Sequence, residues 1–150
     1  VMMLRTARRY DLATDTIIFG NGLPMTKENL RYAGLHDYVD SMFKFCRGMG
    51  VLGVDNAEYA LLTAICIFSD RPGLENGHLV EKVQEMYVLA LMAYLKYRRA
   101  PNSSFLAKML MKLTELRTLS VEHADVLFAL KVEKGSLPPL LMEYFDIMEA

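Results

Sequence analysis

Hydrophobic side chains recur every three or four residues along most of this chain, which is the spacing of one face of an α-helix. Each stretch with this spacing predicts a helix, over Val1–Arg9, Thr26–Tyr32, His36–Met49, Asp55–Phe68, Gly77–Arg99, Ser104–Lys131 and Leu140–Met148. Gly50 and the turn Asp70–Gly73 are predicted to end two of these helices. Because no internal repeat or low-complexity linker divides the chain, the pattern predicts one mostly helical domain.

The segment Thr16–Met25 has a different pattern. Thr16–Phe19 is rich in β-branched and aromatic residues, and Leu23–Met25 follows after Gly20-Asn21-Gly22. Glycine and asparagine adopt the positive φ angles of a tight turn more readily than other residues. The segment therefore predicts a small β-hairpin.

The two ends of the chain carry different signals. No capping residue precedes the apolar residues Val1–Leu4, so we interpret Val1 as lying inside a helix that begins in a longer chain. No basic segment with a small-residue cleavage site follows, as a signal peptide requires. Near the other end, Pro138 and Pro139 precede a short and very apolar helix.

Composition narrows the function classes. The chain has 150 residues, of which 53% are hydrophobic and 23% charged, and 17 Lys and Arg against 18 Asp and Glu give a formal net charge of −1. Such a balance gives no electrostatic attraction to nucleic acid or to an acidic membrane. The longest apolar runs, Tyr59–Phe68 and Met86–Leu95, are about half of what a bilayer requires. The composition predicts a soluble, reduced domain with neither a disulfide framework nor a zinc site.

Catalysis has no support in the motifs. The sequence shows no glycine-rich phosphate loop, no paired-histidine metal spacing and no Gly-x-Ser-x-Gly elbow. Cys46 and His36 lie too far apart along one predicted helix to pair as nucleophile and base. We therefore expect a binding protein and not an enzyme.

A polar pair interrupts the apolar face of the last long helix. Its face consists of Leu106, Met109, Leu113, Leu116, Ser120, His123, Leu127 and Leu130. A buried polar side chain without a partner costs roughly 1–3 kcal/mol, so Ser120 and His123 need one. One interpretation is a core histidine bonded to a neighbour, or a helix break near Leu119–Val121 that turns it outward. The other is that the face opens onto a cavity, where His123 offers a donor and an acceptor to a ligand.

Two further features leave alternatives open. Arg5 directly follows the apolar residues Val1–Leu4, and its guanidinium is either solvated or bonded to a carboxylate, a carbonyl or a ligand oxygen. Leu110 and Met111 lie off the apolar face described above and are bordered by charged and polar residues. This second strip packs either on a partner subunit or on the preceding helix.

The chain resembles the ligand-binding domain of nuclear receptors throughout its length. The segments that carry the resemblance are Val1–Tyr10 (VMMLRTARRY), Asp55–Leu62 (DNAEYALL), Ile67–Pro72 (IFSDRP), Leu113–Leu119 (LTELRTL) and Leu137–Glu143 (LPPLLME). Within the family, the ecdysone receptors are the most similar group, and the oxysterol and bile acid receptors come next. The resemblance makes residues 1–150 the C-terminal part of that domain, from the end of its fifth helix through its twelfth, with the N-terminal third missing.

The family implies an all-α, antiparallel three-layer helical sandwich around an apolar cavity, with one small β-hairpin in its wall. By resemblance the ligand-binding residues are Met2, Met3, Arg5, Ala7, Phe19, Gly20, Leu30, His123, Leu127 and Phe145. Arg5 resembles the arginine with which ecdysone receptors bond the steroid, a position that is glutamate in the oxysterol and bile acid receptors.

Three positions depart from the ecdysone receptor pattern. Leu30 replaces a ligand-bonding tyrosine, His123 replaces an asparagine, and Phe145 replaces a tryptophan of the last helix. His123 agrees instead with the histidine of the oxysterol and bile acid receptors. The departures favour a less hydroxylated sterol, and they keep two alternatives open. One is an oxysterol-like or bile-acid-like receptor, and the other is a ligandless helical module that acts by dimerising or by recruiting coregulators.

The resemblance also implies partners. Leu140, Leu141 and Glu143 match the activation pattern of the last helix, with Glu143 facing the N-terminus of a Leu-x-x-Leu-Leu coactivator helix. Leu110, Met111, Thr114, Arg117 and Thr118 match the surface that pairs with a retinoid X receptor or ultraspiracle partner. The implied protein is a ligand-activated transcription factor of the nucleus. It would bind DNA only through a separate domain, which also would hold the zinc, so no cofactor is expected in this chain.

Overall fold

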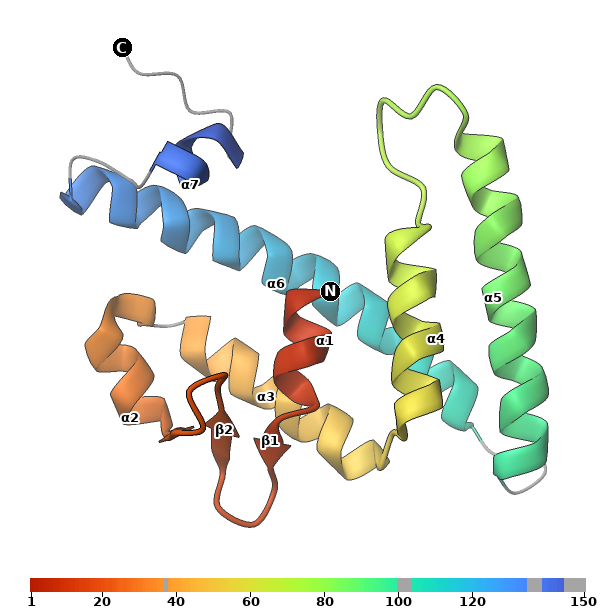
Figure 1. The fold of residues 1–150 in the computed structure, drawn as a ribbon, viewed down its shortest axis with the longest axis horizontal. Coiled ribbons are helices and arrows are strands. Elements are labelled where there is room, and N and C mark those ends of the chain that lie inside the picture. The colour runs from red at the N-terminus through yellow and green to blue at the C-terminus, as the bar shows by residue number, and fades with distance from the viewer. Residues whose placement is uncertain (37, 100–103, 135–138, 145–150) are drawn as a thin grey trace.

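A computed structural model describes residues 1–36, 38–99, 104–134 and 139–144, which are mostly helical (Figure 1). The elements in chain order are α1 (Met2–Ala7), β1 (Tyr10–Asp11), β2 (Thr16–Ile18), β3 (Pro24–Met25), α2 (Lys27–Leu30), η1 (Arg31–Leu35), α3 (Tyr38–Leu52), α4 (Asn56–Ile67), α5 (Gly77–Arg98), α6 (Phe105–Lys134) and α7 (Pro139–Tyr144). The predicted fold class is confirmed, and the arrangement agrees with the helical sandwich that the resemblance implies. Among the described residues, no helix combines the length and the apolarity needed to cross a bilayer.

The sheet has one strand more than the predicted hairpin. β2 pairs antiparallel with β3, as predicted, and β1 pairs antiparallel with the other edge of β2. Ile17 of β2 is fully buried, and the sheet lies against α1 and α3. A strand of two residues is too short to show any alternation of polar and apolar positions, which is why the sequence pattern missed β1.

The helix predicted over Thr26–Tyr32 divides in two. Thr26 caps α2 by accepting a hydrogen bond from the Asn29 N–H over 3.2 Å. The chain then widens into a π turn, η1, which contains Gly34 at a φ of 94°. α3 consequently begins at Tyr38 and not at His36.

α3 continues past the glycine that was predicted to end it. A Cβ at Gly50 would lie 3.0 Å from Leu12 Cγ, so this glycine permits the loop after β1 to approach the helix. α3 ends at Leu52, and the next residue, Gly53, adopts a left-handed φ of 61°. The predicted end at Gly50 is therefore wrong, and Gly53 supplies the conformation that closes helices.

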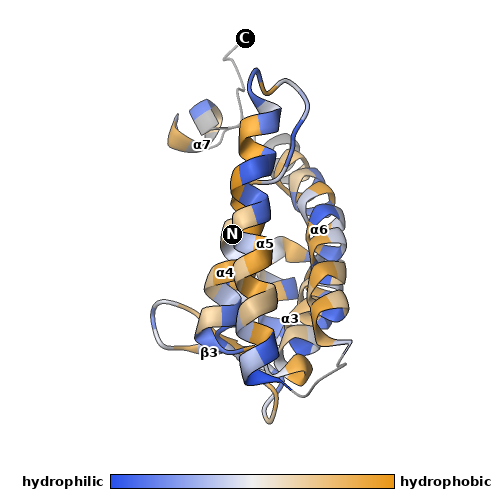
Figure 2. Cartoon of the chain, turned by 90° about the vertical axis from the view of Figure 1, so that its right-hand side faces the viewer, coloured by the Kyte–Doolittle hydropathy of each residue, from blue (hydrophilic) through white to orange (hydrophobic). Residues whose placement is uncertain are grey.

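α4 and α5 run side by side in opposite directions (Figure 1). Leu62 of α4 and Leu91 of α5 are fully buried in the core. Apolar residues nevertheless remain along the side of α5 that faces the viewer in Figure 2. Met86 of this helix is 68% exposed.

α6 crosses α3 and extends beyond it (Figure 1). Met109 and Leu119 are its most deeply buried residues, whereas Ser120 is exposed. The buried face therefore passes through Leu119, and the prediction that Ser120 lies on it is wrong. α6 is continuous across Leu119–Val121, so the helix break considered there does not occur.

Candidate functional site

A buried cluster brings two of the predicted ligand-binding residues together through a third residue. The Tyr38 cluster consists of Met3 from α1, Tyr38 from α3 and His123 from α6. The Tyr38 hydroxyl donates to the Met3 sulfur over 3.2 Å, and its ring centroid lies 5.4 Å from that of His123. Residues 120 positions apart in sequence thus share one site, at the meeting of three helices.

Burial sets the electrostatics of this cluster. Tyr38 is 5% exposed, and its burial raises the pKa of its hydroxyl to about 12, with further increases from Cys46 and from the Glu122 carboxylate. Desolvation lowers the pKa of the half-buried His123 because it disfavours the imidazolium ion. Both shifts favour the uncharged form of the side chain, in which the phenol and the imidazole can exchange hydrogen bonds with an uncharged ligand.

The other predicted ligand-binding residues lie in several environments. Ala7 and Leu30 are buried in the core, at 3% and 5% exposure. Met2 and Arg5 are exposed on the other side of α1, while Leu127 is half-buried. Arg5 makes no ion pair with any residue of the described segments. Phe145 lies outside the described residues.

Phe19 and Gly20 belong to a separate place at the tip of the hairpin. An open depression of about 500 Å³ is lined by Arg8, Arg9, Tyr10, Asp11, Ile18, Phe19, Gly20 and Gly22. Its lining combines two guanidinium groups with apolar side chains. The structure therefore places Phe19 and Gly20 at this hairpin depression and Met3 and His123 in the Tyr38 cluster, and it brings the other predicted ligand-binding residues into neither place.

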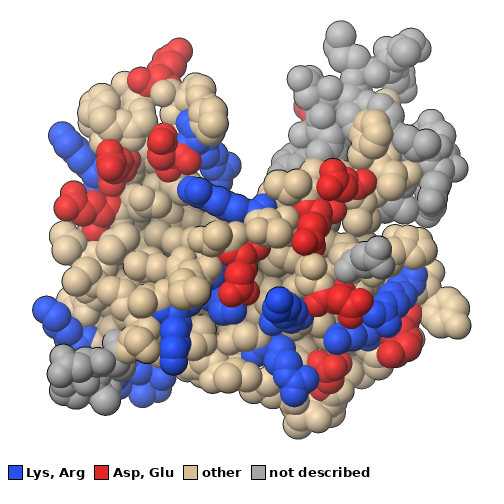
Figure 3. Space-filling view, turned by 180° about the vertical axis from the view of Figure 1, so that it is seen from behind, with Lys and Arg blue, Asp and Glu red and all other residues tan. Residues whose placement is uncertain are grey.

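The predicted dimer residues share one surface of α6. Met111 is 66% exposed, and Thr114, Arg117 and Thr118 are exposed beside it, while Leu110 is half-buried. The Thr118 hydroxyl donates to the Thr114 carbonyl, so it is held against the helix backbone. Basic and acidic side chains are interspersed on the face of the molecule shown in Figure 3. The α6 surface thus combines the apolar side chains of Leu110 and Met111 with two threonines and one charged residue, Arg117.

The activation pattern occupies a helix of its own. α7 spans Pro139–Tyr144, and both Leu140 (74% exposed) and Glu143 project from it into solvent. The side chain of Leu141 lies outside the described part of the chain. A helix of six residues is marginal without a docking surface, so its position can respond to what lies beneath it.

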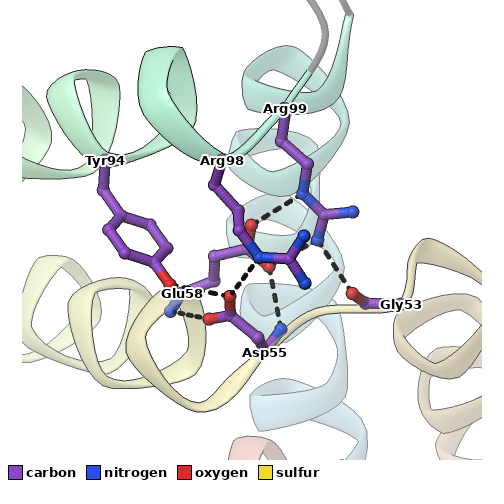
Figure 4. Close-up of polar contacts among 6 residues, drawn as sticks. All are labelled: Gly53, Asp55, Glu58, Tyr94, Arg98 and Arg99. Atoms are coloured by element: carbon purple, nitrogen blue, oxygen red, sulfur yellow. Dashed lines mark hydrogen bonds and ion pairs between the residues drawn. The ribbon is translucent and has the colours of Figure 1, made fainter.

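A polar network at the start of α4 was not predicted as a site (Figure 4). The carboxylate of Glu58 is fully buried and accepts hydrogen bonds from Arg99 and from the Asp55 N–H. Asp55 accepts from the Glu58 N–H, which is the main reason that its pKa is lowered, and from Tyr94 and Arg98. The capping pair Asp55 and Glu58 was visible in the sequence. Its arginine partners were not, because they come from the last residue of α5, Arg98, and from the next residue, Arg99. This network joins α4 to the end of α5.

Tyr38 was also missed, although a signal for it exists. It lies four residues before Met42, one of the apolar positions that predicted α3. Extending that spacing backward would have placed Tyr38 on the buried face of the helix.

Comparisons with known proteins agree with this arrangement. Residues 1–133 match the family model of the ligand-binding domain of nuclear hormone receptors. The chain is 47% identical to the ecdysone receptor of Drosophila melanogaster over 98% of its own length and 17% of that receptor. It is 45% identical to the ecdysone receptor of Chironomus tentans and 43% identical to that of Heliothis virescens, again over 98% of the chain. These matches cover 28% and 26% of the two relatives, so the chain spans less than a third of the length of the relatives it matches.

Proposed function

The chain belongs to the family of nuclear hormone receptor ligand-binding domains, and from this membership we propose that it binds a steroid or related sterol and regulates transcription in response. The observation that carries the proposal is the Tyr38 cluster. It sets the uncharged polar groups of Tyr38 and His123 among buried apolar residues where three helices meet. Ligand sites for apolar molecules combine such walls with a few polar groups that orient the ligand.

The predicted ligand-binding residues favour three different candidates for the ligand. The ecdysone receptor relatives are named for a steroid hormone, and Arg5 supports an ecdysteroid because its guanidinium is available to a ligand oxygen. His123 favours an oxysterol-like or bile-acid-like ligand as a second candidate. Leu30 favours the third candidate, a ligandless module. Its apolar side chain is buried among core residues, so it fills interior space itself.

The response to a ligand would pass through α7. Because this short helix must dock to hide its apolar residues, a ligand that changes the docking surface shifts the population of docked α7. Docked α7 would present Glu143 to the N-terminal N–H groups of a Leu-x-x-Leu-Leu coactivator helix. The α6 surface that contains Met111 would pair with a retinoid X receptor or ultraspiracle partner, in the nucleus.

Native mass spectrometry of the full ligand-binding domain, purified with its partner, tests sterol binding. We expect a bound mass in the sterol range that is lost on gentle heating or on exchange with added ecdysteroid. A domain that is folded, paired and free of bound sterol, and that takes up neither ecdysteroid nor oxysterol, would favour the ligandless module.

A further inference from the structure

One side of α5 is apolar and exposed in the described part of the chain. α5 packs against α4, and its buried residues are Leu91 and Leu95. On another side of the helix, exposed apolar residues recur every three or four positions over about 27 Å, interrupted only by Lys82. This α5 stripe consists of Leu79, Met86, Leu89, Ala90, Ala93 and Tyr97. Because α5 lies at the edge of the molecule (Figure 1), a second molecule has access to the stripe.

The order of side-chain sizes along the α5 stripe is the first indication of what binds there. Large side chains occupy its first half, where Leu89 is 56% exposed, and in the second half Ala90 and Ala93 precede Tyr97. Large side chains fill an interface best when they face small ones. Two copies of α5 that run in opposite directions meet this condition, because the large residues of each copy then face the alanines of the other.

Two exposed charges of opposite sign give the second indication. Glu85 and Lys96 lie on the same edge of the α5 stripe, since their separation along α5 corresponds to about three turns. Neither makes an ion pair with another residue of the described ranges. The midpoint between them falls beside Ala90, inside the stripe. A two-fold axis at this point brings Glu85 of each copy beside Lys96 of the other, so that two ion pairs form.

We propose that the α5 stripe binds a second copy of this chain, with the two α5 helices antiparallel about a two-fold axis beside Ala90. Met86 of each copy then lies between Ala93 and Tyr97 of the other. A parallel pair would set every residue level with its own copy, so Met86 would meet Met86 and Glu85 would not reach Lys96. The proposal is independent of sterol binding, and it leaves the α6 surface to the receptor partner.

Self-association of the full ligand-binding domain, measured by sedimentation equilibrium without a receptor partner, tests the proposal. A contact of one helix per copy is at the small end of specific interfaces, so we expect a dissociation constant in the micromolar range. Met86→Glu should weaken self-association tenfold or more, because each copy would bury an unpaired charge. The control is Val51→Glu on α3, where the valine is 71% exposed, and this variant should associate like the parent.

A charge exchange tests the antiparallel direction. Glu85→Lys alone and Lys96→Glu alone should each weaken self-association about tenfold, since two attractions become two repulsions in every dimer. The double variant Glu85→Lys/Lys96→Glu should recover the affinity of the parent, because it restores both ion pairs with their signs exchanged. Both side chains are exposed in the single copy, so all three variants should keep the melting temperature of the parent.

The outcomes that contradict the proposal are distinct. Self-association that Met86→Glu leaves intact, or that Met111→Glu abolishes instead, would assign the contact to another surface and overturn the proposal. A double variant that stays as weak as the single variants would overturn the antiparallel arrangement. A domain that remains monomeric throughout the micromolar range would overturn the pairing altogether, including the case in which another segment of the full domain covers α5.

Discussion

Arg99 donates hydrogen bonds from Nε and Nη2 to the two carboxylate oxygens of Glu58, over 2.8 and 2.7 Å. The arginine follows the last residue of α5, and its guanidinium also stacks 3.8 Å from the Phe105 ring centroid at the start of α6. Glu58 is fully buried. A single side chain therefore compensates a buried charge and connects three helices.

Arg99→Ala should lower the free energy of unfolding by about 3–5 kcal/mol, because it leaves the Glu58 charge buried without its main partner. Chemical denaturation of the ligand-binding domain measures the change. Arg98→Ala is the matched control, since Arg98 is 51% exposed in its pair with Asp55 and exposed pairs contribute about 0–1 kcal/mol. Equal losses from the two variants would show that the buried charge is not the cause.

The pH dependence of stability should include a contribution from His123. Its pKa in the folded state is lowered by burial, so protons bind more strongly to the unfolded chain. The free energy of unfolding therefore has its full value above the ordinary histidine pKa of about 6.5, and it decreases as the pH falls below that value. His123→Gln should flatten the dependence of the unfolding free energy between about pH 7 and pH 5. A dependence that stays the same in His123→Gln would show that this imidazole does not contribute to it.

Gly53→Ala should destabilise the domain by about 1–2 kcal/mol, because alanine is strained at the left-handed φ of 61° that ends α3. Thermal unfolding measures the loss. Gly53→Asn should cost less, since asparagine tolerates this conformation. Alanine and asparagine variants of equal stability would mean that the backbone angle does not limit this position.

These residues also show which features of the fold and the site sequence patterns can predict. Local signals predicted the hairpin and the extents of α4 and α5, because each depends on residues close together in the chain. The features that the sequence did not predict depend on contacts between distant segments of the chain. Gly50 leaves room for Leu12 inside α3 and does not end the helix, and Tyr38 joins Met3 to His123. Ser120 was misplaced because an error of one residue turns a helical side chain by about 100°.

Met111→Glu should weaken pairing with a retinoid X receptor or ultraspiracle partner by tenfold or more, since it would bury an unpaired charge in the proposed interface. Met111 is 66% exposed, so the fold itself should tolerate the change. Analytical ultracentrifugation or surface plasmon resonance measures the affinity of the pairing. Met86→Glu, with a similar exposure of 68% on α5, is the control that should pair normally. Undiminished pairing of Met111→Glu would show that the partner binds elsewhere.

Glu143→Lys should weaken binding of a Leu-x-x-Leu-Leu peptide several-fold without changing sterol affinity. The lysine would place a positive charge against the positive N-terminal end of the peptide helix. The native carboxylate stabilises that end by about 0.3–1 kcal/mol, and by more when the carboxylate is partly buried. Fluorescence anisotropy of a labelled peptide, titrated with the sterol-loaded domain, measures the loss. Glu85→Lys makes the same charge reversal at an exposed site of α5 and should bind the peptide like the parent. Because sterol affinity is measured in the same samples, loss of both activities would point to unfolding of the domain, whereas loss of peptide binding alone assigns the carboxylate to coactivator recognition.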